Sequence, residues 1–162
     1  MNIKIIQVGQ TKEAPLKTLE AEYEKRLKAF IKLETITIQS CKKDDRTQAQ
    51  KEEADEIRKH LDKNALIVAL DENGQEMTSE EFAKWISHVR DFGEGKIEFV
   101  IGGSHGLHPD LQSQAKTIIS FSKMTFTHEM IRVFLKEQLY RAFMILSNKT
   151  YHKGNAFFGF FA

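Results

Sequence analysis

Residues 97–109 decide the fold, and they read Ile97-Glu98-Phe99-Val100-Ile101-Gly102-Gly103-Ser104-His105-Gly106-Leu107-His108-Pro109. An apolar, β-favouring run ends at paired glycines, and a proline follows where a helix can begin, because the first helical turn does not need the missing N–H. Since glycine has no Cβ, Gly102 and Gly103 can adopt positive φ and let the backbone approach a ligand. On its own, the segment is compatible both with an ordinary tight turn and with a ligand-binding loop.

Further apolar runs of strand length lie on both sides of this segment. Residues 65–70 are apolar throughout, which is typical of a strand covered on both faces of a parallel sheet. The patterns at residues 3–8, 33–38 and 117–121 predict three more strands. Residues 71–74 are predicted to turn the chain after the run at 65–70.

Segments with helical spacing separate the predicted strands. A helix after Pro15 is predicted to bury a stripe made of Leu16, Leu19, Tyr23, Leu27 and Phe30. Thr78 to Glu81 form a capping-box pattern that predicts a helix start. Further helices are expected at 44–61, largely exposed, and at 109–116 and 128–146. Alternating strands and helices predict one α/β domain with a mostly parallel sheet and helices on both faces.

The composition excludes several classes of protein. Cys41 is the single cysteine among 162 residues, so an internal disulfide is impossible and a cysteine-based zinc site has no support. The first eight residues are too short an apolar run for a signal peptide, and no run approaches the length of a membrane span. We therefore expect a cytoplasmic protein with no membrane partner.

The formal charge is unevenly divided along the chain. From Gly102 onward the chain contains seven basic and three acidic residues, which gives this part a formal charge of +4. Since the whole chain has a net charge of +1, the first 101 residues carry −3. A basic C-terminal part that includes the glycine loop suggests an anionic partner such as RNA. An ordinary solvated surface would have the same composition.

The glycine loop fits neither of the two common nucleotide motifs. It lacks the Gly-Lys-Ser/Thr ending of a P-loop and the glycine spacing of a dinucleotide fingerprint, which disfavours an ATPase or a dehydrogenase. His105 and His108 are three residues apart, but no carboxylate or cysteine completes a metal-ligand set there. We expect surface or loop-capping histidines and no metal.

Three loops that follow predicted strands are the candidates for a binding site. They are the turn after Leu70, the Gly102-Gly103 pair and the run from Phe121 to Phe126. In α/β sheets ligands bind at the carboxyl ends of strands, so the three loops could enclose one small molecule. Apolar walls from Leu70, Ile101, Phe121 and Met124 would suit an adenine ring.

Longer strings in the second half resemble one known family. The strings are Phe99-Val-Ile-Gly-Gly-Ser-x-Gly-Leu107, Leu-His-Pro around residue 108, Ser120-Phe-Ser-Lys-Met-Thr-Phe126, Arg132, Glu137-Gln-x-Tyr-Arg-Ala142 and Tyr151-His-Lys153. They resemble the RlmH family of small bacterial SPOUT-class methyltransferases, and the likeness extends from Ile3 to Lys153.

The resemblance implies a SPOUT-type fold with a C-terminal trefoil knot, S-adenosylmethionine as methyl donor, and methylation of N3 of a pseudouridine in a hairpin loop of 23S ribosomal RNA. It also implies a homodimer in which the C-terminal tail of one subunit completes the pocket of the other. The donor-binding residues that it implies are Leu70, Gly102, Phe121, Ser122, Lys123, Met124, Thr125 and Phe126. The substrate-side residues that it implies are Arg141, Tyr151 and His152.

Each of these roles has a structural alternative. His152 would accept the imide proton, or it would bind phosphate or order the tail. Arg141 would hold a phosphate or the deprotonated imide, or its side chain would extend to solvent. Tyr151 would stack on the target base or pack as an aromatic anchor, and Lys123 would meet RNA or solvate a loop. Arg132 would have a functional role like that of Arg141, or it would form an ion pair with Glu129 or Glu137, and the sequence is equally compatible with both.

Two features depart from the family pattern. Family members commonly have proline where this chain has Thr127, so we expect a looser entry into the last helix. Residues 154–162 add a phenylalanine-rich extension beyond a single methyltransferase domain at 1–153, and we expect it to be disordered or weakly docked.

Two other functions are compatible with the sequence. One is a ribosome-associated protein that binds the methyl donor without catalysis. The other is a regulatory nucleotide-binding module of flavodoxin-like topology.

Overall fold

A single five-stranded sheet forms the centre of the computed structural model, which describes residues 1–93 and 95–148. Its strands are β1 (Asn2–Val8), β2 (Lys32–Ile38), β3 (Leu66–Glu76), β4 (Lys96–Ile101) and β5 (Thr117–Ser120). They lie in the order β2-β1-β4-β3-β5, and every neighbouring pair is parallel. The predicted α/β architecture with a parallel sheet is confirmed, whereas the trefoil knot stays a prediction.

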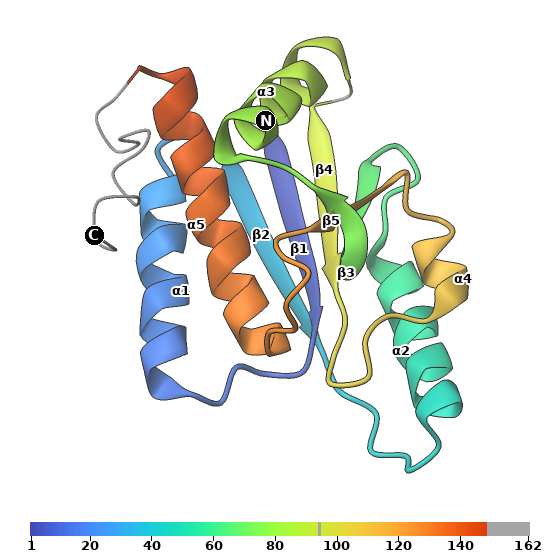
Figure 1. Ribbon diagram of the computed structural model, residues 1–162. Coiled ribbons are helices and arrows are strands. Elements are labelled where there is room, and N and C mark those ends of the chain that lie inside the picture. Colours follow the sequence, from blue (N-terminus) through green and yellow to red (C-terminus); the bar gives the residue numbers. More distant parts are fainter. Residues whose placement is uncertain (94, 149–162) are drawn as a thin grey trace.

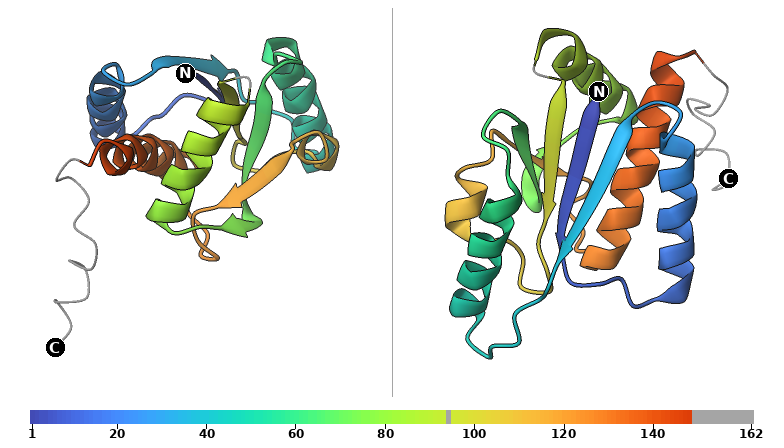
Figure 2. Two further views of the ribbon diagram at one scale, coloured as in Figure 1. Left: turned by 90° about the horizontal axis from the view of Figure 1, so that it is seen from above. Right: turned by 180° about the vertical axis from the view of Figure 1, so that it is seen from behind.

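Helices cover both faces of the sheet (Figures 1 and 2). One face carries α1 (Ala14–Leu27), α3 (Ser79–Phe92) and α5 (His128–Leu146), and the other carries α2 (Arg46–His60) and α4 (Pro109–Gln112). The connections from β1 to β2 and from β3 to β4 run in one direction across the sheet, and those from β2 to β3 and from β4 to β5 run in the other. Because such crossovers are right-handed, a reversal of direction places the next helix on the opposite face. The strand order therefore accounts for α1 and α3 on one face and α2 and α4 on the other, whereas α5, which follows the last strand, packs against α1 and α3.

Each face of the sheet has its own hydrophobic core. Phe99 packs in the core beneath α1, α3 and α5, whereas its neighbour Val100 packs in the core beneath α2 and α4. Successive side chains of a strand point to opposite faces, so a central strand buried on both sides is mostly apolar. In the part of the chain that the structure describes, no helix is both long enough and apolar enough to cross a membrane.

Local caps define where two of the helices begin. The predicted capping box of α3 is present: the Thr78 hydroxyl accepts from the Glu81 amide at 3.2 Å, and the Glu81 carboxylate accepts from the Thr78 amide at 2.7 Å. Helix α5 begins at His128, as predicted, and the hydroxyl of Thr127 accepts from the Met130 amide at 3.3 Å. The expectation that Thr127 loosens this helix start is wrong, because its hydroxyl supplies a cap that proline lacks.

Some predicted boundaries and faces were also wrong. The strand β3 continues through the predicted turn at 71–74, with a shift of register between Leu70 and Gln75 where it pairs with β5. Helix α4 ends at Gln112 rather than at 116. On α1, Leu19 is 43% exposed and Glu20 is buried instead. Glu20 can be buried there because it pairs with Lys136 of α5.

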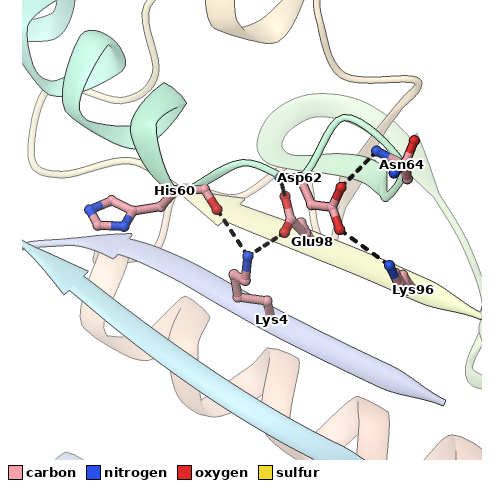
Figure 3. A network of polar contacts seen from close by, with 6 residues as sticks. All are labelled: Lys4, His60, Asp62, Asn64, Lys96 and Glu98. Atoms are coloured by element: carbon pink, nitrogen blue, oxygen red, sulfur yellow. Dashed lines mark hydrogen bonds and ion pairs between the residues drawn. The ribbon is translucent and has the colours of Figure 1, made fainter.

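A polar network joins α2 to the sheet at the start of the β4 strand (Figure 3). The Lys4 ammonium on β1 donates to the Glu98 carboxylate at 2.6 Å and to the His60 carbonyl, at the end of α2, at 2.9 Å. The other Glu98 oxygen accepts from the Asp62 amide at 2.9 Å. Glu98 is 3% exposed, and these partners satisfy a carboxylate that would otherwise be costly to bury. The network therefore fixes the end of α2 and leaves the opposite end of the sheet for a site.

Candidate functional site

A cleft of about 1080 Å³ lies where β4, β5 and the β4-paired part of β3 end. These ends are neighbours because β3 lies between β4 and β5 in the sheet. Its walls come from residues 70–73, 101–107, 119–122 and 124–129, with further side chains from α1, α2 and α4. This is the edge at which parallel α/β sheets bind ligands, and the three segments predicted to line a site meet there, although the one after Leu70 is part of β3 rather than a turn.

The loop after β4 forms the floor of the cleft. A Cβ atom on Gly102 would lie 2.6 Å from the carbonyl carbon of Gly106 and 2.9 Å from the Leu107 nitrogen, so no side chain fits there. Gly103 and Gly106 form an isolated antiparallel bridge, in which the Gly106 amide donates to the Gly103 carbonyl at 3.0 Å. Positive φ occurs at Gly106, at +75°, and not at Gly102 or Gly103. Gly102 is therefore needed for close packing rather than for a positive φ.

The loop from Phe121 to Phe126 forms the opposite wall. Ser120 shapes its start, since the Ser120 hydroxyl donates to the Ser122 carbonyl at 2.8 Å and accepts from the Ser122 amide at 3.2 Å. The Ser122 hydroxyl then accepts from the Met124 amide at 2.9 Å. The Thr125 hydroxyl donates to the Glu72 carboxylate at 2.7 Å, which ties this loop to the segment after Leu70.

The structure brings most of the sequence-predicted donor residues together. Seven of the eight line the cleft: Leu70, Gly102, Phe121, Ser122, Met124, Thr125 and Phe126. The eighth, Lys123, is exposed and is not part of the lining. Met124 is 72% exposed, so one apolar wall of the cleft is open to solvent. Donor binding by these residues stays a prediction.

Two side chains of α2 also belong to the site, and sequence reasoning missed them. The Arg46 guanidinium and the Gln50 amide donate to the His105 carbonyl, at 3.1 and 2.6 Å. These two hydrogen bonds hold the glycine loop against α2, a helix that the sequence predicts to be largely exposed. No local pattern marks them, because their partner lies more than fifty residues away in the chain.

The start of α5 closes the cleft on the side of β1. His128 and Glu129 both belong to the lining, and the Glu129 carboxylate accepts from the amides of Lys12 and Glu13 at 3.0 and 3.3 Å. Burial would raise the pKa of Glu129, but these two amide hydrogen bonds outweigh it and lower the pKa. The carboxylate thus anchors the loop before α1 to the start of α5.

Next to the Glu129 carboxylate lies a buried cluster of polar and charged side chains, which consists of Thr11, Glu20, Arg132 and Lys136. Arg132 is fully buried and donates to the Val8 carbonyl at 2.6 Å and to the Thr11 hydroxyl at 2.8 Å. Arg132 therefore bonds to the end of β1 and the loop after it, rather than forming either of the ion pairs considered from the sequence. Glu137 pairs instead with Arg141.

The predicted substrate-side residues are not gathered at this cleft. Arg141 is half-buried and lies thirteen residues beyond His128 on the same helix, about 20 Å away at 1.5 Å per residue. Its Nε donates to the Glu137 carboxylate at 3.0 Å. Tyr151, His152 and the extension 154–162 lie outside the described residues. Within one chain, the described part of the protein supplies a cleft without its predicted substrate side.

The histidines near the glycine loop do not form a metal centre. His108 caps α4, since its Nδ1 accepts from the Asp110 amide at 3.2 Å. Across residues 1–93 and 95–148, no group of three or more side chains is arranged to hold a metal ion.

Comparisons with known proteins agree with this architecture. The family model described as predicted SPOUT methyltransferase matches residues 1–152. Proteins named ribosomal RNA large subunit methyltransferase H from Clostridium botulinum and Clostridium tetani are 45% and 42% identical over 159 residues, which take in 94% of this chain and the whole of each relative.

Solved structures share the fold at low sequence identity. A probable methylase family protein from Haemophilus influenzae is 12% identical, with a TM-score of 0.59 over 93% of this chain and 70% of its own. A probable methyltransferase from Bordetella pertussis is 14% identical, with a TM-score of 0.55 over 86% of this chain and 95% of its own. A family match across nearly the whole chain, full-length relatives above 40% identity and this shared fold lead to one conclusion: the chain belongs to the SPOUT methyltransferase family.

Proposed function

We propose that this protein transfers a methyl group from S-adenosylmethionine to N3 of a pseudouridine in a hairpin loop of large-subunit ribosomal RNA. The main support is the cleft whose floor contains Gly102, in a chain whose full-length relatives are named as methyltransferases of that RNA. The donor would supply a methyl group on a positively charged sulfur. The work left to the protein is to bind the donor, orient the acceptor nitrogen and accept its proton.

The described residues fit such a donor. Leu70, Ile101 and Phe121 provide apolar walls for an adenine ring, and the missing Cβ of Gly102 lets the 102–106 hairpin fold closely beneath it. Among charged side chains, the lining holds the carboxylates of Glu13, Asp71, Glu72 and Glu129 and one guanidinium, that of Arg46. An excess of carboxylates favours a ligand with a positively charged sulfur over a phosphate.

The expected result of a transfer assay is incorporation of label from methyl-labelled donor into ribosomal RNA. Intact large subunits and assembled ribosomes from cells that lack the modification serve as parallel substrates, and mapping of the modified base identifies its position. Ribosomes that already carry the methyl group are the control and should take up no label. Tight donor binding with no incorporation into either particle would instead support a donor-binding protein without catalysis.

The functional unit that we propose is a homodimer in which Arg141, Tyr151 and His152 of one subunit complete the cleft of the other. The separation of about 20 Å between Arg141 and the cleft of its own chain supports this arrangement. In this proposal Arg141 holds a phosphate or the deprotonated imide, Tyr151 stacks on the target base, and His152 binds phosphate or orders the tail. A planar guanidinium such as that of Arg141 suits a phosphate or a deprotonated imide.

Mixed dimers test this arrangement. Gly102→Ala and Arg141→Gln chains, each expected to have little activity alone at a donor concentration near the wild-type Kd, should regain activity when they are unfolded and refolded together. In a symmetric dimer with random pairing, about a quarter of the sites would combine an intact cleft with an intact arginine. Separately refolded chains mixed just before the assay are the control. Activity that stays absent after co-refolding would mean that cleft and arginine act within one chain.

A further inference from the structure

The start of α5 places one imidazole, that of His128, directly in the lining of the cleft. We propose that His128 is the group that accepts the proton from the acceptor nitrogen during methyl transfer. This inference rests on the proposed function and assigns a role to a residue that sequence reasoning left without one.

The position of His128 is fixed from both sides. It is the first residue of α5, and the Thr127 cap holds it two residues after Phe126 of the proposed donor loop. On its other side, the Glu129 carboxylate is bonded to the amides of Lys12 and Glu13. One turn further on, Arg132 is bonded to the end of β1 and the loop after it. The imidazole therefore stands on a rigid helix end between the donor loop and the loop after β1.

The surroundings of His128 keep the imidazole uncharged. Partial burial is the largest cause that lowers its pKa, the Arg132 guanidinium and the Lys12 ammonium lower it further, and the Glu129 carboxylate opposes them. The other charged or titratable groups in the same lining are Glu13, Arg46, Asp71, Glu72 and a second imidazole, that of His105 on the glycine loop. A histidine with a pKa below its usual value is unprotonated at neutral pH and can accept a proton there.

The carboxylates of the lining are less suited to this role. Glu129 already accepts two amide hydrogen bonds, which lower its pKa and weaken it as a base. Asp71 accepts from the Gln112 amide at 2.8 Å, and Glu72 accepts from the Thr125 hydroxyl. A general base works best when its pKa lies near the working pH, which favours an imidazole over these carboxylates.

The proton and electron balance of the step is simple. The N3–H proton passes to the free nitrogen of His128, and the nitrogen electron pair that is left forms the new N–C bond to the methyl carbon. The carbon–sulfur bond breaks, and its electron pair stays on sulfur as a neutral thioether. The imidazolium then releases its proton to solvent, so no oxidant, reductant or metal takes part.

Replacement of His128 by asparagine or alanine tests the assignment. We expect kcat to fall by about a hundredfold, at the lower end of what general bases contribute, with no change in the Kd for S-adenosylmethionine. The fall in wild-type kcat below the pKa of His128, as the pH is lowered, should be absent in His128→Asn. Added imidazole should restore part of the activity of His128→Ala, which a merely structural residue would not permit.

Matched variants keep the result interpretable. His88→Asn removes an exposed histidine on α3 that packs against Phe92, away from the cleft, and should leave kcat and its pH profile unchanged. Thermal melting of each variant, with His128→Gln as a second substitution, identifies any that fail to fold. A His105→Asn enzyme that loses the acid limb while His128→Asn keeps it would overturn the assignment.

Two other results would also count against His128. Normal kcat in a well-folded His128→Asn enzyme would remove it from the chemistry, and loss of donor binding with no imidazole rescue would make it a structural residue. A wild-type protein that transfers no methyl group at all is a different outcome, because it contradicts the proposed function before any variant is compared.

Discussion

Gly102→Ala is expected to weaken binding of S-adenosylmethionine by one to two orders of magnitude. The added Cβ would lie 2.6 Å from the Gly106 carbonyl carbon, and backbone on both sides of the hairpin leaves no flexible side chain to move away. Overpacking of this kind costs about 1–3 kcal/mol, and each 1.4 kcal/mol lost from binding is about tenfold in Kd. Titration calorimetry with the donor or with S-adenosylhomocysteine measures the effect directly.

The control for this substitution is another glycine next to the same strand. Gly95 precedes β4 at the end of the sheet away from the cleft, has a φ of +65°, and a Cβ there would meet nothing within 4 Å. Asparagine tolerates this φ, so Gly95→Asn should fold and bind the donor as the wild type does. An unchanged Kd in a well-folded Gly102→Ala protein would mean that the 102–106 hairpin can shift to accommodate the added Cβ without weakening donor binding.

Lys136→Met is expected to give the largest loss of stability, about 3–5 kcal/mol of the free energy of unfolding. The Lys136 side chain is 1% exposed, and its ammonium pairs with the Glu20 carboxylate and, at 2.8 Å, with that of Glu24. Methionine fills similar space but leaves the buried Glu20 carboxylate with the Thr11 hydroxyl as its remaining bonded partner in the cluster. Urea denaturation followed by circular dichroism provides the measurement.

Two comparison variants separate burial from charge. Lys59→Met removes a lysine that is largely exposed and pairs with Glu56 on the surface of α2, and it should leave the urea midpoint unchanged. Lys136→Met combined with Glu20→Gln should recover part of the loss, because the buried charge is neutralised. If Lys136→Met unfolds at the same urea concentration as Lys59→Met, the buried cluster does not stabilise the fold.

The sequence was informative where structure depends on neighbours in the chain. The apolar run at 65–70 predicted a strand buried on both faces, Thr78 and Glu81 predicted a helix start, and each prediction needed only residues within a few positions. The glycine pair after β4 predicted a loop at the ligand-binding edge for the same reason. Even there the physical cause differed, since the close approach of Gly106 excludes a side chain at Gly102.

Contacts between distant segments were beyond local reasoning. Glu20 and Lys136 are 116 residues apart, and the hydrogen bond from Arg132 to Val8 spans 124. A charged residue on a helix is predicted to be exposed when its partner is not known. For this reason Leu19 was predicted to be buried and Glu20 was not. The anchoring of the glycine loop by Gln50, and of the loop before α1 by Glu129, was hidden for the same reason.

Local sequence patterns were enough to predict the succession of strands and helices, the parallel sheet and the segments that can line a site. These features follow from backbone preferences and from apolar periodicity, both of which act over short stretches of chain. Three-dimensional contacts were needed to show which charged side chains are buried, that His128 lines the cleft, and that Arg141 lies far from the cleft of its own chain. Those outcomes depend on which distant segments meet, because the cost of burying a charge is set by the partner that it finds.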